Sequence, residues 1–233
     1  MSLLAETHIK EIVKFINSLS STRGAETVYR DWCECFALSI ANGCNPLKES
    51  ELWKKRENRY LDIIKNYTKE EAFTFSEMCA HLTMAFDADP YQDHLGKIYM
   101  ELFGGNKKLG QCFTPIDLCY ACADIALDEL KAGEVRTLAD ECSGGGAMLI
   151  AACKRYHDAG VDYQRWLKIT AGDVDALCVH MTYIQLSLIG ARAEVWQRNA
   201  ITRQCYDRFV TPMEVLWPMK YAEVLDKEGE NND

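Results

Sequence analysis

The stretch that decides the fold is Asp140–Leu149, which reads DECSGGGAML. An apolar run with Val135 and Leu138 precedes it, and a helical run over 147–156 follows it, so the order predicts a strand, a glycine-rich turn and a helix. Glycine suits such a turn because it tolerates positive φ and lets the backbone approach a ligand closely. The free N–H groups of the next helix favour an anion, whereas Asp140 suits a cationic or hydroxyl-bearing ligand. The stretch therefore predicts a nucleotide-like ligand in an α/β domain.

Composition sets broad limits on the fold and on the partners. The chain has 233 residues, of which 48% are hydrophobic, which is enough for one large or two small domains with a real core. Its formal charge of −9 argues against a protein that binds nucleic acid without a partner. The weak basic character is N-terminal, because residues 1–110 hold 14 Lys/Arg against 16 Asp/Glu and residues 111–233 hold 12 against 19.

Cysteine usage and hydropathy indicate a cytoplasmic protein with reduced thiols. The 11 cysteines are odd in number and irregularly spaced, and the N-terminus lacks the basic and apolar regions of a signal peptide. No apolar run approaches the roughly 20 residues of a membrane span, so no membrane partner is expected. Cys119 and Cys122 form a lone CxxC in a helical run, which favours buried packing over a metal or redox site.

Residues 1–105 are predicted to be a helical N-terminal region. Apolar residues recur at helical spacing, and Thr68 with Glu71 forms a capping box. The run Lys54–Arg56 is expected to be a solvated face rather than a DNA-backbone contact, because acidic neighbours dilute it. The five predicted helices are Leu4–Leu19, Ala25–Asn42, Glu49–Tyr67, Thr68–Phe86 and Tyr91–Phe103.

Beyond that region, strands and helices alternate over 106–200, which predicts a parallel sheet with right-handed crossovers. Thr114 is the expected N-cap of a helix that starts at Pro115 and ends near Ala132, and Asp175 is the expected cap of the last helix. Residues 201–233 form a C-terminal extension in which no strand is predicted and whose acidic end is expected to fray. The three predicted strands are Val135–Asp140, Leu167–Asp173 and Ala193–Gln197.

Three segments in this order carry a resemblance. They are GQCFTP at 110–115, DECSGGGAML, and GDVDALCVHMTYIQLSLIG at 172–190. Together they resemble the amino-terminal half of the catalytic domain of adenine-N6 DNA methyltransferases, above all the methylase subunits of type I restriction-modification systems. The resemblance covers roughly residues 92–200. It implies a helical N-terminal region followed by a truncated Rossmann-like, S-adenosylmethionine-dependent methyltransferase fold with a parallel sheet.

The resemblance also implies which residues bind the cofactor. These are Phe113, Thr114, Pro115, Asp140, Gly144, Gly146, Asp173 and Asn199. Phe113, Thr114 and Pro115 would pack on S-adenosylmethionine and contact its methionine end. Asp140 would pair with the cofactor's amino group, and Gly144 with Gly146 would supply the close backbone approach. No metal is implied.

The remaining two positions follow the second and third strands. Asp173 would hold the ribose hydroxyls, since ligands bind at the carboxyl ends of parallel strands. Asn199 stands where the family has an acid that accepts from the adenine amino group. An alternative for Asp140 and Asp173 is that they are ordinary strand-end acids that cap helices. Glu141 and Gly145 replace the usual Pro and Ser, and Glu141 adds a second negative charge beside the ligand.

The family's catalytic motif, a Pro-Pro-aromatic sequence after Asp, Asn or Ser, is missing. In that motif an oxygen accepts from the adenine amino group and the aromatic ring stacks on the flipped base. The five prolines are never adjacent, so no catalytic residue is identified. Asp89-Pro90-Tyr91 is a near match, but it follows a predicted helix rather than a strand and is expected to be a turn.

With only three strands, the first is expected at an edge of the sheet, where it needs a cover. Residues 200–220 could fold over it through Tyr206, Phe209 and Trp217, or a second chain or a homo-oligomer could cover it. The resemblance implies an adenine-N6 DNA methyltransferase-like protein of a restriction-modification or mobile-element system, with DNA as a partner but not unaided. The alternatives are an inactive methyltransferase-fold interaction module and, less consistent with the Phe-Thr-Pro loop, a small-molecule methyltransferase.

Overall fold

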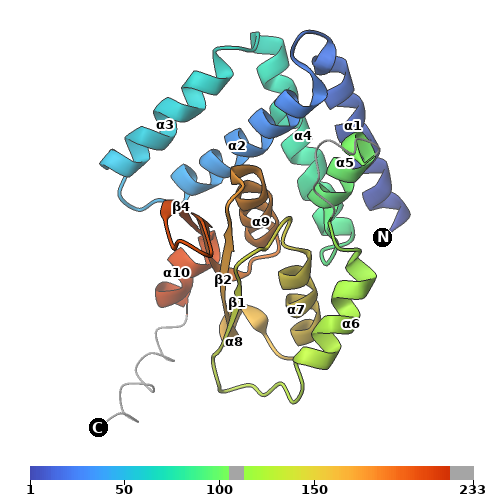
Figure 1. Ribbon diagram of the computed structural model, residues 1–233, viewed down its shortest axis with the longest axis vertical. Helices are drawn as coiled ribbons and strands as arrows, with labels where there is room; N and C mark the ends of the chain where they lie inside the picture. Colours follow the sequence, from blue (N-terminus) through green and yellow to red (C-terminus); the bar gives the residue numbers. More distant parts are fainter. Residues whose placement is uncertain (105–112, 221–233) are drawn as a thin grey trace.

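The computed structural model describes residues 1–104 and 113–220, with side chains to Trp217. Its N-terminal part is helical (Figure 1), and all five predicted helices are confirmed with ends shifted by a few residues. Thr68 and Glu71 form the predicted capping box at the start of the fourth helix. The helices are α1 (Leu3–Arg23), α2 (Ala25–Gly43), α3 (Glu51–Ile64), α4 (Lys69–Ala88) and α5 (His94–Phe103).

The second part alternates strands and helices, as predicted, and contains two helices and one strand that were not predicted. Its elements are α6 (Ile116–Ala126), β1 (Arg136–Asp140), α7 (Ala147–Asp158), α8 (Tyr163–Trp166), β2 (Leu167–Asp173), α9 (Ala176–Leu188), β3 (Arg192–Arg198), β4 (Cys205–Val210) and α10 (Pro212–Lys220). The loop residues 110–112 lie outside the described residues. The structure is therefore an α/β fold with a helical N-terminal region.

The strands form one sheet in the order β1-β2-β3-β4. β1, β2 and β3 run parallel, with Asp140 opposite Ala171 and Asp173 opposite Gln197. β4 is antiparallel to β3, so the sheet is mixed and mostly parallel, and the prediction of a purely parallel sheet was incomplete. β4 was missed because Asp207 and Arg208 interrupt its apolar alternation.

β1 lies at an edge of the described sheet, as predicted, but the predicted cover from residues 200–220 is wrong. β4 lies at the opposite edge, where Phe209 pairs in register with Val195 and is buried. Trp217 of α10 contacts the Arg192 guanidinium of β3, with 3.8 Å between the guanidinium carbon and the ring centroid. Tyr206 is half exposed on β4. A short turn brings the chain back onto β3, whereas reaching β1 would require crossing the whole sheet.

Three local predictions are corrected. Pro115, not Thr114, is the N-cap of α6, without a side-chain capping bond, and α6 ends at Ala126 rather than near Ala132. In α3, Lys54 and Lys55 are solvent-accessible, but Arg56 is only 7% exposed and points inward, so the run is not a single solvated face. The helix is amphipathic, and Arg56 lies on its inner side.

The helical and α/β parts share one hydrophobic core. α9 lies between α2 and the sheet, and every residue from Leu177 to Leu186 is buried, including the polar His180, Thr182 and Gln185. Arg30 of α2 pairs with Asp175, the predicted cap of α9, at 3.2 Å, and Asp175 accepts from the Leu177 N–H. No helix within the described residues is both long and apolar enough to cross a membrane.

Candidate functional site

The glycine-rich turn joins β1 to α7 and folds back on β2. Gly144 and Gly146 have φ values of +53° and +89°, which side chains disfavour. The Gly146 N–H donates to the Ser143 carbonyl at 2.8 Å, and the Ser143 N–H donates to the Gly172 carbonyl at 2.9 Å. The turn is therefore fixed at the carboxyl end of β2, beside the carboxyl end of β1.

Two side chains of helix α9, one helical turn apart, form hydrogen bonds with the backbone of the glycine-rich turn. Thr182 donates to the Gly144 carbonyl at 2.9 Å, and Gln185 donates to the Gly145 carbonyl at 2.6 Å. The Gln185 amide also donates to Asp93 at 2.8 Å and accepts from the Leu95 N–H at 3.1 Å. Because these groups are buried and paired, the backbone of the turn is held in one conformation.

The two predicted acids flank this turn. Asp173 accepts from the Gly144 N–H and from the Asp175 N–H, both at 3.0 Å, and Asp140 accepts from the Cys142 N–H at 3.1 Å. Both acids therefore fix turns, but neither caps a helix as the alternative interpretation expected, because the N-caps of α7 and α9 are Gly146 and Asp175. A carboxylate offers about four acceptor positions, so these bonds leave room for ligand hydroxyl or amino groups.

The Phe-Thr-Pro segment also reaches the turn. A Cβ added to Gly144 would lie 3.4 Å from the Phe113 ring, and Phe113 packs edge-on against Tyr99. Thr114 and Pro115 line a cavity of about 370 Å³ together with Phe113. The structure thus brings together residues from all three segments that the sequence singled out.

Glu141 has a partner that the sequence did not reveal. Its carboxylate pairs with Arg198 of β3, with Arg198 Nε 2.8 Å from Glu141 Oε2. The pair crosses the end of β2, because a Cβ on Gly172 would lie 3.1 Å from Arg198 Nε and 3.2 Å from Glu141 Oε2. The second negative charge expected beside the ligand is therefore compensated within the chain.

Asn199 follows β3 but serves a local turn. Its side-chain oxygen accepts from the Ile201 and Thr202 N–H groups at 2.9 and 3.0 Å, and its N–H donates to the Gln204 carbonyl. An amide oxygen has two lone pairs, so both are in use. Asn199 thus caps the turn between β3 and β4, and the acceptor role implied by the resemblance would require that turn to open.

Asp89-Pro90-Tyr91 is a turn after α4, as expected, and not the end of a strand. The Asp89 carboxylate accepts from the Ser2 N–H at 2.7 Å, and the Tyr91 carbonyl accepts from the Tyr120 hydroxyl. The Tyr91 ring contacts His157, with 5.1 Å between centroids. These contacts tie α4 to α1, α6 and α7, so the near match has a structural role.

Besides Thr182 and Arg198, two further residues of the site, Asp93 and Gln185, were not predicted. Asp93 caps α5, accepts from the Gly96 N–H at 2.8 Å, and lies 3.1 Å from where a Gly145 Cβ would be. Burial raises the pKa of Asp93, although hydrogen bonds from Gln185 and Gly96 oppose this. The available signal was Gln185 itself, one of three polar residues, with His180 and Thr182, in the buried run Leu177–Leu186 of α9.

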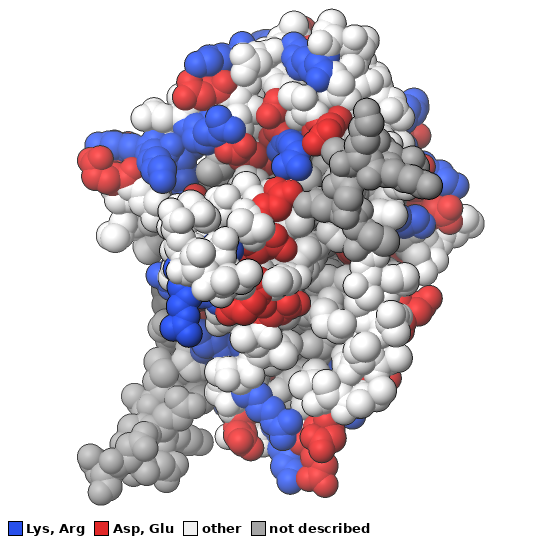
Figure 2. Space-filling model, viewed as in Figure 1, with Lys and Arg blue, Asp and Glu red and all other residues white. Residues whose placement is uncertain are grey.

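Acidic groups dominate the carboxyl end of the parallel strands, where Asp140, Glu141, Asp173 and Asp175 lie. Figure 2 shows one face of the molecule, on which acidic side chains gather near the middle and basic ones are scattered around them. That face has no broad basic patch of the kind that tracks a phosphate backbone. Within the described residues, no cluster of three or more His, Cys, Asp or Glu suits a metal ion.

Chemically, the site offers two strand-end carboxylates, a rigid backbone turn and an aromatic ring. These groups can hold a ligand with cationic and hydroxyl groups. Cys119 of the CxxC pair is buried in α6, consistent with packing. Comparison with protein-family models, curated proteins and solved structures finds no match.

Proposed function

We propose that this chain is an S-adenosylmethionine-dependent DNA adenine-N6 methyltransferase-like protein of a restriction-modification or mobile-element system, built on part of a Rossmann-like fold. One observation carries the proposal. The Gly144 N–H donates to Asp173 across the ends of two parallel strands, with Asp140 at the end of the first and Phe113 against the glycine. The sequence resemblance assigns these positions to the cofactor.

The residues present fit the cofactor's groups. The remaining acceptor positions of Asp173 suit the two ribose hydroxyls, and Asp140 suits the cationic amino group of the methionine end. Phe113 offers an apolar surface, and Gly144 leaves the space beside that ring without a side chain. When bound, S-adenosylmethionine supplies an electrophilic methyl group. This chain's residues would bind and orient it.

Acceptance of the methyl group needs a site for the target adenine, and the full sequence has no Pro-Pro-aromatic motif. In the proposal, a partner chain supplies that site and most of the DNA contact, since the carboxyl end of the sheet is acidic. A second candidate function is an inactive methyltransferase-fold interaction module. It is favoured by Asn199, whose oxygen is occupied by its own turn.

Calorimetric titration with S-adenosylmethionine tests the cofactor site. We expect binding by the wild type and at least about tenfold weaker binding by Asp140→Ala, because the ligand's amino group loses a charged partner. Asp128→Ala, which removes an exposed acid outside the site, is the matched control. Absence of heat at millimolar ligand, with an unchanged circular dichroism spectrum, would refute the proposal.

Transfer of a labelled methyl group to unmethylated DNA separates the two candidate functions. The enzyme is expected to label DNA when cell extract from a host that lacks this chain supplies the partner, and Asp140→Ala is expected to abolish the signal. Extract without this protein is the control. Cofactor binding without any transfer, with or without extract, would favour the interaction module.

A further inference from the structure

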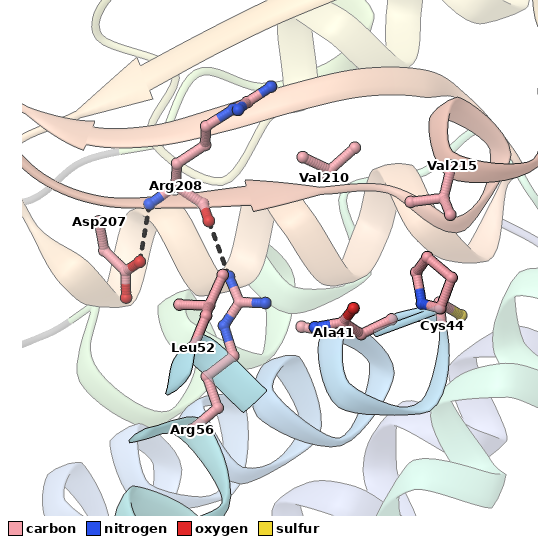
Figure 3. Close-up of a pocket in the computed structure, with 10 residues that line it drawn as sticks. Ala41, Cys44, Leu52, Arg56, Asp207, Arg208, Val210 and Val215 are labelled. Carbon is pink, nitrogen blue, oxygen red and sulfur yellow. Dashed lines mark hydrogen bonds between the residues drawn. The ribbon is translucent and has the colours of Figure 1, made fainter. Parts of the chain in front are cut away.

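A second cavity lies at the β4 edge of the sheet, the opposite edge from β1. It has a volume of about 300 Å³ and lies between the α2–α3 connection and the β4–α10 segment. Figure 3 shows Arg56 reaching into this region from α3 toward β4. Most of the other walls are apolar, formed by Ala41, Pro46, Leu52, Val210 and Val215.

Arg56 brings a buried positive charge to this cavity. The residue is 7% exposed, its Nη2 donates to the Arg208 carbonyl at 2.8 Å, and its guanidinium carbon lies 4.9 Å from the centroid of the Phe209 ring. Within the part of the chain that the structure describes, its buried Nε has no hydrogen-bond partner and no carboxylate forms an ion pair with it. The other terminal nitrogen points toward Ala41 (Figure 3).

The neighbouring charged groups do not neutralise this guanidinium directly. Burial lowers the pKa of Arg56, and the nearby Asp207 carboxylate offsets the shift only in part. That carboxylate accepts from the Arg208 N–H at 2.8 Å, and the Arg208 side chain points away to Glu194. Arginine does not deprotonate in proteins, so the cost of its burial has to be met by an anion or by hydrogen bonds.

We propose that this cavity binds a small apolar monocarboxylate, whose carboxylate group pairs with Arg56 and whose hydrocarbon body lies against Leu52, Val210 and Val215. The volume is at the lower end of the range for ligand pockets, which suits a short acid. Among the described residues, only one cationic side chain, that of Arg56, faces the apolar walls, which disfavours phosphates and dicarboxylates, because their second charge would be desolvated without a partner. The site is separate from the glycine-rich turn and goes beyond the proposed function.

Calorimetric titration of the full chain with hexanoate tests the proposal. Hexanamide serves as a neutral ligand of the same shape. Hexanoate is expected to bind at least about tenfold more tightly than hexanamide, because only the acid forms a charge-assisted pair with a buried guanidinium. Succinate is expected to bind more weakly than hexanoate. Equal affinities for hexanoate and hexanamide, or no binding of hexanoate at millimolar concentration, would overturn the proposal.

Variants locate the binding. Arg56→Met is expected to abolish the preference for hexanoate, whereas Lys55→Met, at the adjacent exposed position, is expected to leave it unchanged. Val215→Phe keeps Arg56 and fills the cavity, so it is expected to weaken binding of both ligands even if Arg56→Met does not fold. Hexanoate binding that survives Val215→Phe would place the ligand elsewhere and contradict the assignment. Binding of S-adenosylmethionine is expected to be unaffected by Val215→Phe, so the two proposals can fail independently.

Discussion

Gly146 shows how one residue sets the geometry of the turn. Its φ is +89°, and a Cβ would lie 3.2 Å from the Thr182 hydroxyl, so Gly146→Ala combines backbone strain with a close contact. We expect it to lower the free energy of unfolding by about 1–3 kcal/mol in urea titrations. Gly43→Ala is the matched control, because a Cβ there meets nothing within 4 Å at the end of a helix. Equal losses in the two variants would show that the turn is not strained by a side chain.

Gln185 connects the turn to the helical region. In Gln185→Leu, the Leu95 N–H and the Gly145 carbonyl lose their buried partner. Each unsatisfied buried group costs about 1–3 kcal/mol, so we expect a marked loss of stability in chemical unfolding. Gln197→Leu, which removes one exposed 3.4 Å hydrogen bond, is expected to change stability by less than about 0.5 kcal/mol. Similar effects of both substitutions would contradict this assignment.

The buried carboxyl group of Asp93 is expected to make the stability of the fold depend on pH. Its pKa is raised by burial, so the folded chain binds this proton more readily than the unfolded chain. Its contribution to stability therefore falls as pH rises from the unfolded-state pKa of about 4 through the raised folded-state pKa. Asp93→Asn keeps an acceptor oxygen and does not titrate, so its stability relative to wild type should increase over that window. Urea unfolding at a series of pH values measures this, and a constant difference would refute it.

At this scale, the sequence predicted the residues that local pattern can reveal. Gly144, Gly146, Asp140 and Asp173 come together because strand–turn–helix order brings the ends of neighbouring parallel strands to one edge. Gln185 was not predicted as a site residue, because its partner Asp93 is 92 positions away in the sequence. Periodicity says which face of a helix is buried, but not which distant carboxylate that face meets.

At the scale of elements, helices were predicted well and the C-terminal segment was not. The helices have long apolar periodicity and recognisable caps, such as Thr68 at α4 and Asp175 at α9. β4 is six residues long with two charged residues in its middle, and its stability depends on β3 beside it. Its pairing is a tertiary property, so no local signal predicts at which edge of the sheet it lies.

The position of β1 at an open edge of the sheet predicts fast amide hydrogen exchange in this strand. It is paired only with β2 in the described sheet, and its residues alternate between half-buried and exposed. We expect peptides that cover Arg136–Asp140 to exchange amide hydrogen at least about tenfold faster than peptides that cover Leu167–Asp173. If a second chain covers this edge, as expected from the sequence, exchange in β1 should slow when cell extract supplies that partner. Equal exchange of both strands in a monodisperse monomer would contradict the open edge.

At the scale of the molecule, one core spans the helical and α/β parts, although the sequence pattern divides near residue 105. α9 packs against α2 on one side and against the sheet on the other, and the Tyr29 hydroxyl donates to the Leu95 carbonyl at 2.9 Å. Domains that share a core and buried hydrogen bonds do not unfold separately. The two parts are therefore expected to unfold in one cooperative transition.

A substitution far from the sheet tests this cooperativity. Ile12 is fully buried in α1, and Ile12→Ala is expected to cost about 2–5 kcal/mol. Because unfolding is cooperative, the slowest amides of β2 should lose the same free energy of protection, although Ile12 lies in the N-terminal helical region. Leu3→Ala, on the same helix but 81% exposed, is the control and should leave that protection unchanged. If the helical part were an independent domain, Ile12→Ala would lower protection in the N-terminal helices alone and leave the protection of β2 unchanged, although Gln185 links the glycine-rich turn to Asp93 and Leu95 at the start of α5.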